Sequence, residues 1–379
     1  MRIGILADLY LPHISGITVF IFLYRKTLES FGHEAHVFTF GPPQAGDEAA
    51  RVHRTPGLRI GKTGFFINPQ HAPRNRELIR SMDLLHVTHP FLSGTLAFRY
   101  RRTPSTPVVF TSQTRYDLYI QHNFPAPVRP PARWLLRAFM PGFCRRCAMI
   151  IAPSASAITM LRALGVKRKI EIIPNPVDLE AFHPQEKLRR DRTRAVYIGR
   201  LAAEKNLAFL LRAFSIAVSQ HPSLELSIVG DGPERTALEA LARDLGLDPH
   251  AIFLGERPHE ELPAVLSGYD LFLTASLTEV HPLSLIEAMA AGLPVVAVGG
   301  AGICETVQDG VSGLLSANSA ADFAEKILRI ANDPALGRKL AAGAARAAQA
   351  YDLRNVTRQH LDKFAALVPA QGSTHAIRE

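Results

Sequence analysis

Residues 278–292, with the sequence TEVHPLSLIEAMAAG, decide how the second half of the chain is organised. They lie between two short apolar stretches, 269–275 and 294–298, that predict buried strands. Pro282 precedes apolar residues at helical spacing. Because proline is favoured at the first position of a helix, we expect a helix to begin near Pro282. The stretch therefore predicts a strand, a loop, a helix and a second strand, in that order.

Two glutamates flank the start of this expected helix. Glu279 lies in the loop before it and Glu287 lies about one turn inside it. The first N–H groups of a helix have no acceptor within the helix, so those near Leu283 predict a site for a phosphate. A carboxylate can accept hydrogen bonds from two neighbouring sugar hydroxyls. Solvated charges at a helix end would have the same pattern, and this stretch alone does not decide between the two interpretations.

Length and composition indicate a globular protein of two domains. The chain has 379 residues, 47% of them hydrophobic, and three cysteines. It contains no apolar run long enough for a membrane span, and its N-terminus has the pattern of a strand and not of a signal peptide, so we expect a cytoplasmic protein. Cys144 and Cys147 form a C-x-x-C pair without a second pair, which argues against both a disulfide framework and zinc.

Positive charge is concentrated in the first half of the chain. Residues 1–180 hold 23 Lys and Arg against 11 Asp and Glu. A basic surface favours an anionic partner, although a GC-rich genome would also produce many arginines. No aromatic-basic platform for nucleic acid accompanies the charge. The basic segment 125–147 contains the only tryptophan, Trp134, and we expect it to lie peripherally on an anionic membrane surface.

Strands and helices alternate along both halves, which predicts two doubly wound α/β domains. We expect the first domain over 1–183 and the second over 184–352, with a polar linker at 183–193. A last helix over 353–367 would cross back to the first domain, and 368–379 would be a flexible tail. Residues 41–75, rich in Gly, Pro and Arg, are expected to form a loop.

Three loops of the second domain follow strands and carry charged or small residues. Arg200 and Lys205, after the first strand, could both reach a bound phosphate. Residues 230–233, with the sequence GDGP, favour a tight turn. Arg257, after the next strand, could offer a flat face to a nucleotide base.

Three loops of the first domain have the same position relative to its strands. Gly16 would let a phosphate approach the backbone closely. His89 follows another strand, where a lone histidine is more often structural than functional. The polar run 111–119 follows a third strand, and a surface loop has no packing need for so many polar groups; its candidate site residues are Gln113, Arg115, Tyr116 and Asp117.

These motifs, in this order, resemble the retaining GT-B glycosyltransferases, in the large family that includes sucrose synthases and phosphatidylinositol mannosyltransferases. The resemblance covers nearly the whole chain, from Ile3 to about Leu367. The motifs that carry it are GRLAAEKN, VGDGPE, TEVHPLSLIEAMAAGLPVVA and GICETVQDGVSGLL. It implies two Rossmann-like domains facing across a cleft, with a nucleotide sugar bound by the second and an acceptor bound by the first.

The resemblance also implies roles for individual residues. Arg200 and Lys205 would hold the diphosphate, Glu287 the ribose and Glu279 the transferred sugar. Arg257, His281, Gly16 and the amides near Leu283 would complete the donor site, and Arg115, Tyr116 and Asp117 the acceptor site. Glu279, Gln113 and His89 are the candidate catalytic residues. No Asp-x-Asp motif occurs in the chain, so we expect neither a metal nor another cofactor beside the UDP- or GDP-sugar.

Within the family, YLPHISGITVF and FTSQTRYDLYIQHNFP look most like enzymes that glycosylate diacylglycerol or related lipids. Three positions depart from that pattern. Ser15 replaces a loop glycine, Val280 and His281 replace a glycine and a phenylalanine, and Gln113 replaces a histidine. Glutamine can bind a sugar hydroxyl but cannot carry a proton, so the last change bears on turnover.

Three hypotheses remain open on the sequence. The first is transfer of a hexose, such as glucose from UDP-glucose, to a lipid hydroxyl. The second is the same chemistry on a soluble or polysaccharide acceptor. The third is a nucleotide-sugar epimerase or a non-catalytic sugar-nucleotide binding protein, which Gln113 keeps in consideration.

Overall fold

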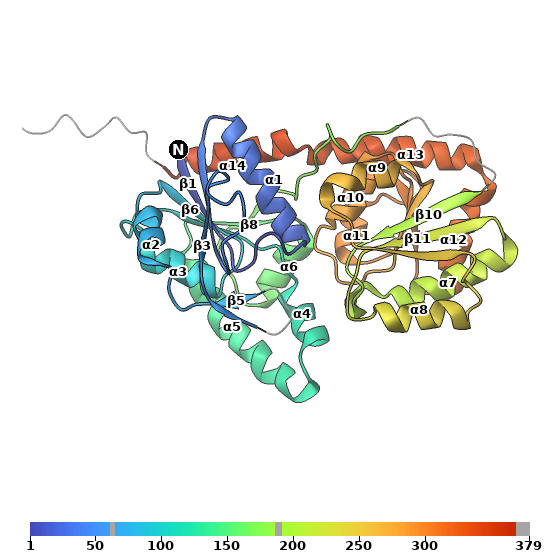
Figure 1. Ribbon diagram of the computed structural model, residues 1–379, viewed down its shortest axis with the longest axis horizontal. Coiled ribbons are helices and arrows are strands. Elements are labelled where there is room, and N and C mark those ends of the chain that lie inside the picture. The colour runs from blue at the N-terminus through green and yellow to red at the C-terminus, as the bar shows by residue number, and fades with distance from the viewer. Residues whose placement is uncertain (61–64, 186–191, 369–379) are drawn as a thin grey trace, which may run out of the picture. The chain divides into compact units, whose positions relative to one another are not determined.

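The computed structural model describes residues 1–60, 65–185 and 192–368 (Figure 1). The chain divides into two compact units: unit 1 is Met1–Asp117, Pro125–Asn175 and Leu353–Glu379, and unit 2 is Leu118–Phe124 and Pro176–Asp352. The change of unit after Asn175 comes earlier than the expected boundary at 183/184. Most of the expected linker and the expected tail lie outside the described residues.

Unit 1 is built on a seven-stranded sheet with the order β3-β2-β1-β6-β7-β8-β9. All paired strands of this sheet run parallel. Its strands are β1 (Arg2–Leu6), β2 (Glu34–Phe40), β3 (Val52–Thr55), β6 (Leu84–Val87), β7 (Val108–Thr111), β8 (Met149–Ala152) and β9 (Glu171–Ile172). A separate antiparallel pair consists of β4 (Leu58–Arg59) and β5 (Phe66–Ile67).

The expectation of a loop over residues 41–75 is wrong in part. The edge strand β3 lies there, together with β4, β5 and the start of helix α2 (Pro73–Arg80). Strand β3 has four residues and only its two end residues are buried. An edge strand this short has no apolar run to mark it, which is why the pattern did not reveal it.

The helices of unit 1 cover its sheet. Helix α1 (Gly16–Ser30) begins at a capping box between Ser15 and Thr18 and buries Phe20, Tyr24 and Leu28. The capping box pairs N–H groups that the helix itself would leave unpaired, and this fixes where α1 starts. The others are α2, α3 (Leu92–Tyr100), α5 (Arg129–Arg146), α6 (Ala155–Ala163) and α14 (Leu353–Ala365), with the turn η1 (Ala126–Val128), while α4 (Tyr116–Asn123) crosses from unit 1 into unit 2.

Unit 2 contains a six-stranded sheet with the order β12-β11-β10-β13-β14-β15, again with all paired strands parallel. Its strands are β10 (Thr193–Ile198), β11 (Leu224–Val229), β12 (Ala251–Gly255), β13 (Leu271–Thr274), β14 (Val295–Val298) and β15 (Gly313–Ser316). The apolar runs at 194–199, 224–230, 252–254, 269–275 and 294–298 predict the first five of these strands, and β15 is an addition to them.

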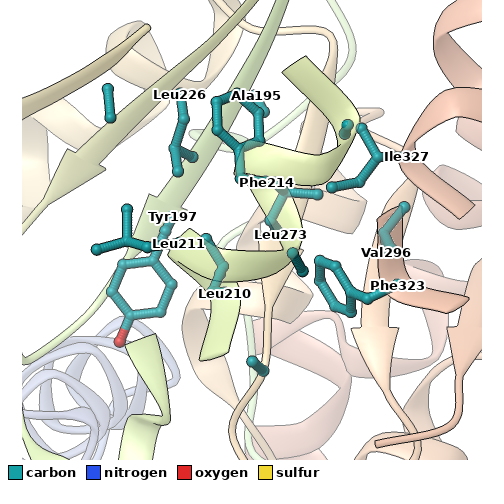
Figure 2. Close-up of a cluster of buried hydrophobic side chains, with 14 of the residues drawn as sticks. Ala195, Tyr197, Leu210, Leu211, Phe214, Leu226, Leu273, Val296, Phe323 and Ile327 are labelled. Atoms are coloured by element: carbon teal, nitrogen blue, oxygen red, sulfur yellow. The ribbon is translucent and has the colours of Figure 1, made fainter. Parts of the chain in front are cut away.

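Alternating side chains of β10 divide the core of unit 2 between the two faces of its sheet. Ala195 and Tyr197 belong to one buried cluster and Val196 and Ile198 to the other. Figure 2 shows the first cluster, in which Phe214 and Phe323 come from the helices packed on that face. The helices are α7 (Leu207–Gln220), α8 (Arg235–Asp244), α9 (Leu262–Ser267), α10 (Leu283–Ala290), α11 (Ala301–Thr306), α12 (Ala320–Asn332) and α13 (Pro334–Ala348), with the turns η2 (Ala203–Lys205), η3 (His259–Glu261) and η4 (Gln349–Tyr351).

Helix α14, the last described helix, packs in unit 1. The His360 ring lies 5.0 Å from the Tyr24 ring and 5.8 Å from the His86 ring, centroid to centroid. Lys363 donates to Glu171 at 2.9 Å. The chain thus forms the long segment of unit 2 from Pro176 to Asp352 and then returns to complete the core of unit 1.

Each sheet has one point where the strand order reverses. In unit 1 it lies between β1 and β6, and in unit 2 between β10 and β13. In open parallel sheets, ligands bind outside the carboxyl ends of the strands at such a point. The loops after these strands are therefore where a binding site is expected in each unit.

Candidate active site

In unit 2 an ion pair spans the point of reversal. Lys205 ends the turn after β10, and Glu279 lies in the loop after β13. The Lys205 Nζ donates to Glu279 Oε1 at 2.6 Å. The two side chains keep only 25% and 17% of their surface exposed, so this is a partly desolvated pair. Two residues that the sequence predicted on separate grounds are thus brought into contact.

The environment of Glu279 keeps its carboxyl group ionised. Burial raises the pKa of Glu279, but the charge of Lys205 and hydrogen bonds from Lys205 and Ser276 outweigh burial and hold the pKa below its usual value. Asn206, next to Lys205, has a left-handed backbone with φ of 56° and donates to the Ala275 carbonyl at 3.4 Å. This contact ties the turn that carries Lys205 to the end of β13.

Helix α10 begins directly after the Glu279 loop. Pro282, expected at the first helical position, is instead the N-cap, and the helix begins one residue later, at Leu283. The first hydrogen bond of the helix runs from the Ile286 N–H to the Pro282 carbonyl. The N–H groups of Leu283, Ser284 and Leu285 therefore precede the helical ladder and are available to an anion.

Glu287 lies one turn into α10 and contacts a histidine. Its Oε1 accepts a hydrogen bond from the His259 Nε2 at 2.8 Å, and 6% of its side chain is exposed. Burial lowers the pKa of His259, but the hydrogen bond and charge of Glu287, with Glu260 and Asp178, outweigh burial and raise it. His259 therefore orients the Glu287 carboxylate and balances its charge.

The remaining predicted donor residues are less tightly held. Arg200 is half exposed and forms an ion pair with Glu204. Arg257 lies 3.9 Å from Glu261 and is also about half exposed. His281 is buried against the Tyr351 ring, and burial lowers its pKa to about 3, so its ring is neutral.

The glycines at 230 and 232 have a packing role, in line with the tight turn that the sequence predicts. Gly230 has φ of +138°, and a Cβ atom on it would lie 2.0 Å from the Gly199 carbonyl oxygen. A Cβ atom on Gly232 would lie 2.3 Å from the Leu201 carbonyl oxygen. Glycine at both positions lets this turn pack on the loop that carries Arg200.

In unit 1, His89 and Asp8 lie at the point where the strand order reverses. The Asp8 N–H donates to the His89 Nδ1 at 3.3 Å, so the neutral ring carries its proton on Nε2. Burial lowers the pKa of His89, while the charge of Asp8 opposes that shift. Asp8 Oδ1 in turn accepts from the Ser93 N–H at 2.7 Å. His86, the other histidine of this loop, is instead buried in the core and bonds Thr111 at 2.7 Å.

Gln113 follows β7, the next strand of the same sheet. Its amide nitrogen is buried and has no hydrogen-bond partner among the described residues. Arg115 binds Asp117 through two hydrogen bonds of 2.9 and 2.8 Å, which satisfies much of the charge of both predicted acceptor residues. Tyr116 is buried, with its ring 5.8 Å from that of Phe91.

Gly16 is the first residue of α1 and is exposed, directly after the Ser15 cap. Sequence reasoning missed Asp8 and His259. Asp8 directly follows the apolar first strand, and His259 follows Arg257 by two residues, so strand-end position was the available signal for both. In the described part of the chain, no group of three or more His, Cys, Asp or Glu side chains is arranged to hold a metal ion. None of the described helices is both long and apolar enough to cross a membrane.

Two Rossmann-like units, each with a large parallel sheet and polar loops at its point of strand reversal, are the architecture of the GT-B class of glycosyltransferases. Comparison with family models agrees with this class. Residues 178–348 match the model for glycosyl transferases group 1, and residues 14–181 match that for glycosyltransferase family 4. The chain belongs to this glycosyltransferase family.

Individual proteins show the same relationship. The chain is 27% identical over 358 residues to an alpha-monoglucosyldiacylglycerol synthase of Acholeplasma laidlawii, covering 88% of this chain and 89% of that one. It is 31% identical over 375 residues to a D-inositol 3-phosphate glycosyltransferase of Corynebacterium kroppenstedtii, covering 86% and 79%. The solved structure of Anabaena Alr3699/HepE with UDP and glucose superposes with a TM-score of 0.77 at 20% identity, over 97% of this chain and 100% of the other.

Proposed function

We propose that the protein transfers a hexose from a nucleotide sugar, UDP-glucose or a close analogue, to a lipid hydroxyl with retention of anomeric configuration. The observation that carries the proposal is the ion pair between Lys205 and Glu279 beside the first N–H groups of α10, which precede its hydrogen-bond ladder. It places a cation, an anion site and a buried carboxylate at one strand-reversal point. A nucleotide diphosphate sugar requires these three kinds of group side by side.

Each donor group has a partner in this site. The Lys205 ammonium and the amides of Leu283 to Leu285 neutralise the diphosphate, and Arg200 joins them by exchanging Glu204 for phosphate. The Glu287 carboxylate, oriented by His259, accepts the two ribose hydroxyls. Glu279 binds hydroxyls of the hexose once Lys205 has turned to the phosphate.

The reaction needs a leaving group that can accept a proton. The acceptor oxygen forms a bond to the anomeric carbon from the side that the phosphate leaves, and the bond between that carbon and the phosphate oxygen breaks. The proton of the acceptor hydroxyl passes to the departing phosphate. Lys205 and the helix amides stabilise the charge that develops there, so the proposed reaction requires no metal.

Unit 1 supplies the acceptor site in this proposal. The unpartnered Gln113 amide and the His89 Nε2–H are hydrogen-bond donors at the ends of neighbouring strands. They suit hydroxyl oxygens and fix the acceptor's orientation. The choice of a lipid acceptor is supported by the similarity to an alpha-monoglucosyldiacylglycerol synthase. The other proposed acceptor residues, Arg115, Tyr116 and Asp117, follow Gln113 in the same loop.

Thermal shift followed by an activity assay tests the proposal. A panel of UDP- and GDP-sugars identifies the donor, since a ligand that binds only the folded state raises the melting temperature. The preferred donor is then incubated with diacylglycerol in mixed micelles or with soluble glycosides, with and without EDTA. We expect an α-linked glycolipid whose yield EDTA does not change. Transfer to soluble glycosides alone would refute the lipid acceptor, and loss of activity in EDTA would refute the metal-independent reaction.

Gln113 favours a second candidate, a sugar-nucleotide binding protein with little or no turnover. Its side chain stands where the related enzymes carry a histidine and cannot transfer a proton. Donor binding without turnover on any acceptor, with turnover gained by Gln113→His, would favour this candidate over the enzyme.

A further inference from the structure

Helix α5 has a buried face and an opposite face that is apolar although it is exposed. Leu136, Met140, Phe143 and Cys144 recur at helical spacing and are buried. On the other side, Trp134 and Leu135 keep 70% and 62% of their surface exposed. We define the α5 outer face by the exposed apolar residues of α5 and of the turn before it: Pro125, Ala126, Pro127, Val128, Pro130, Pro131, Trp134, Leu135 and Ala138.

The charge around this face has a single sign. Arg133 and Arg137 are exposed beside Trp134 and Leu135. No Asp or Glu occurs between Asp117 and Glu171, whereas this interval contains nine Lys and Arg: Arg129, Arg133, Arg137, Arg145, Arg146, Arg162, Lys167, Arg168 and Lys169. An ordinary solvated helix face carries charges of both signs and few aromatic residues. Tryptophan with arginine and without acid is the combination that binds the headgroup region of an anionic bilayer.

The outer face is also continuous with aromatic residues near the proposed acceptor loop. The Phe139 ring lies 5.4 Å from the Phe91 ring, and the Phe91 ring lies 5.8 Å from that of Tyr116. Phe139 is one turn beyond Leu135 on the same side of α5. Phe91 itself keeps 47% of its surface exposed. An apolar path therefore leads from the exposed end of α5 to the loop of Gln113 within unit 1.

We propose that the α5 outer face inserts into the headgroup and upper acyl region of an anionic phospholipid bilayer and so holds unit 1 where a lipid acceptor is exposed. Figure 1 shows the first turns of α5 extending past the sheet on which its later turns pack, as insertion requires. Trp134 and Leu135 enter the interface, and the arginines bind lipid phosphates. The reason given for membrane binding rests on the lipid acceptor of the proposed function. The binding itself requires neither the sugar donor nor turnover.

The protein provides its own reporter, because Trp134 is its only tryptophan. The full chain is mixed with phosphatidylcholine vesicles with and without phosphatidylglycerol, and binding is followed by cosedimentation and tryptophan emission. We expect binding to the anionic vesicles alone, weakened by salt, with emission shifted to shorter wavelength and quenched by brominated acyl chains. Absence of cosedimentation at low salt would overturn the proposal. Cosedimentation with unchanged, unquenched emission would also overturn it, because another surface would then be bound.

Variants assign the binding to this face. Leu135→Glu should abolish the emission shift, and the double change Arg133→Ala and Arg137→Ala should weaken binding about 25-fold, at about fivefold for each arginine near an anionic surface. Matched controls change exposed residues of unit 2. Ile252→Glu is the control for Leu135→Glu, and the double change Arg338→Ala and Lys339→Ala is the control for the double arginine variant. Equal losses in test and control variants would refute the assignment. Thermal shift with UDP on each variant tests donor binding separately, so failure of membrane binding is distinguishable from failure of the proposed function.

Discussion

The ion pair between Lys205 and Glu279 supports one prediction that separates structure from catalysis. In Lys205→Met, the Glu279 carboxylate loses the charge that lowers its pKa and keeps the burial that raises it. Removing one partner of a buried pair costs about 3–5 kcal/mol. Because the two side chains keep 25% and 17% exposure, we expect the lower end of that range, about 3 kcal/mol. For a unit of this size, the melting temperature should fall by about 6–12 °C.

The sign of the pH dependence follows from the same contact. The wild-type pKa of Glu279 is depressed, so the pair stabilises the fold above the carboxyl's unfolded pKa and this contribution is lost as pH falls through its folded pKa. In Lys205→Met the lone carboxyl is protonated at higher pH than in the wild type. The difference in melting temperature between wild type and variant should therefore be large at pH 7 and small near pH 4.

A double-mutant cycle provides the control. Glu279→Gln leaves Lys205 partly exposed and should cost less than Lys205→Met. The double variant should be more stable than Lys205→Met alone, because no buried charge is left, with a coupling of about 2 kcal/mol. UDP should still bind Glu279→Gln and bind Lys205→Met weakly, while neither variant transfers sugar. Additive losses that do not change with pH would refute the reasoning.

Three further predictions concern other parts of the chain. His259→Phe should lower the melting temperature more at pH 6 than at pH 8.5. The folded protein raises the pKa of His259, so the stability that this histidine contributes is present below its unfolded pKa and is lost as pH rises through its folded pKa. Equal losses at both pH values would contradict this. Burial lowers the pKa of His360 to about 4, so this ring alone should contribute about 3 kcal/mol to the stability that unit 1 loses between pH 6.5 and 4. His360→Phe should reduce that loss by about the same amount in urea unfolding, while the other buried histidines keep their share. Gly343→Ala should lower the melting temperature by preventing correct packing of α13, since its Cβ atom would lie 1.8 Å from the Val311 carbonyl oxygen. Gly337→Ala on the same helix is the control: the nearest atom to its Cβ would be 3.6 Å away, so the melting temperature should stay the same or rise slightly.

The parts of the fold with long apolar runs could be predicted from the sequence. The apolar runs predict strands over 34–40 and 84–87, and these are the bounds of β2 and β6. Apolar residues at helical spacing predict a helix over 17–31, which is one residue later than α1 at each end. The edge strands β3 and β15 were missed. Edge strands are short and half-exposed, so their patterns resemble loops. Their positions depend on the neighbouring strand, which local sequence does not reveal.

The site divides in a similar way. Because parallel strands end at one edge of a sheet, the loops of Lys205 and Glu279 could be placed together from strand order alone. The direct ion pair between them, and the histidine on Glu287, depend on side-chain contacts between segments 74 and 28 residues apart. Sequence spacing carries no information on such contacts. The roles assigned to these residues in binding and transfer stay predictions.

The return of the chain to unit 1 through α14 has a consequence for synthesis on the ribosome. The Val177 N–H bonds the Tyr351 carbonyl at 2.8 Å, so the two ends of the 176–352 segment are adjacent. Such a segment can close its core as soon as it emerges, while the nascent first half still exposes Tyr24 and His86. Folding of the N-terminal portion is therefore completed only after the final helix is translated, and a premature stop after Asp352 would release a chain with one finished and one open core.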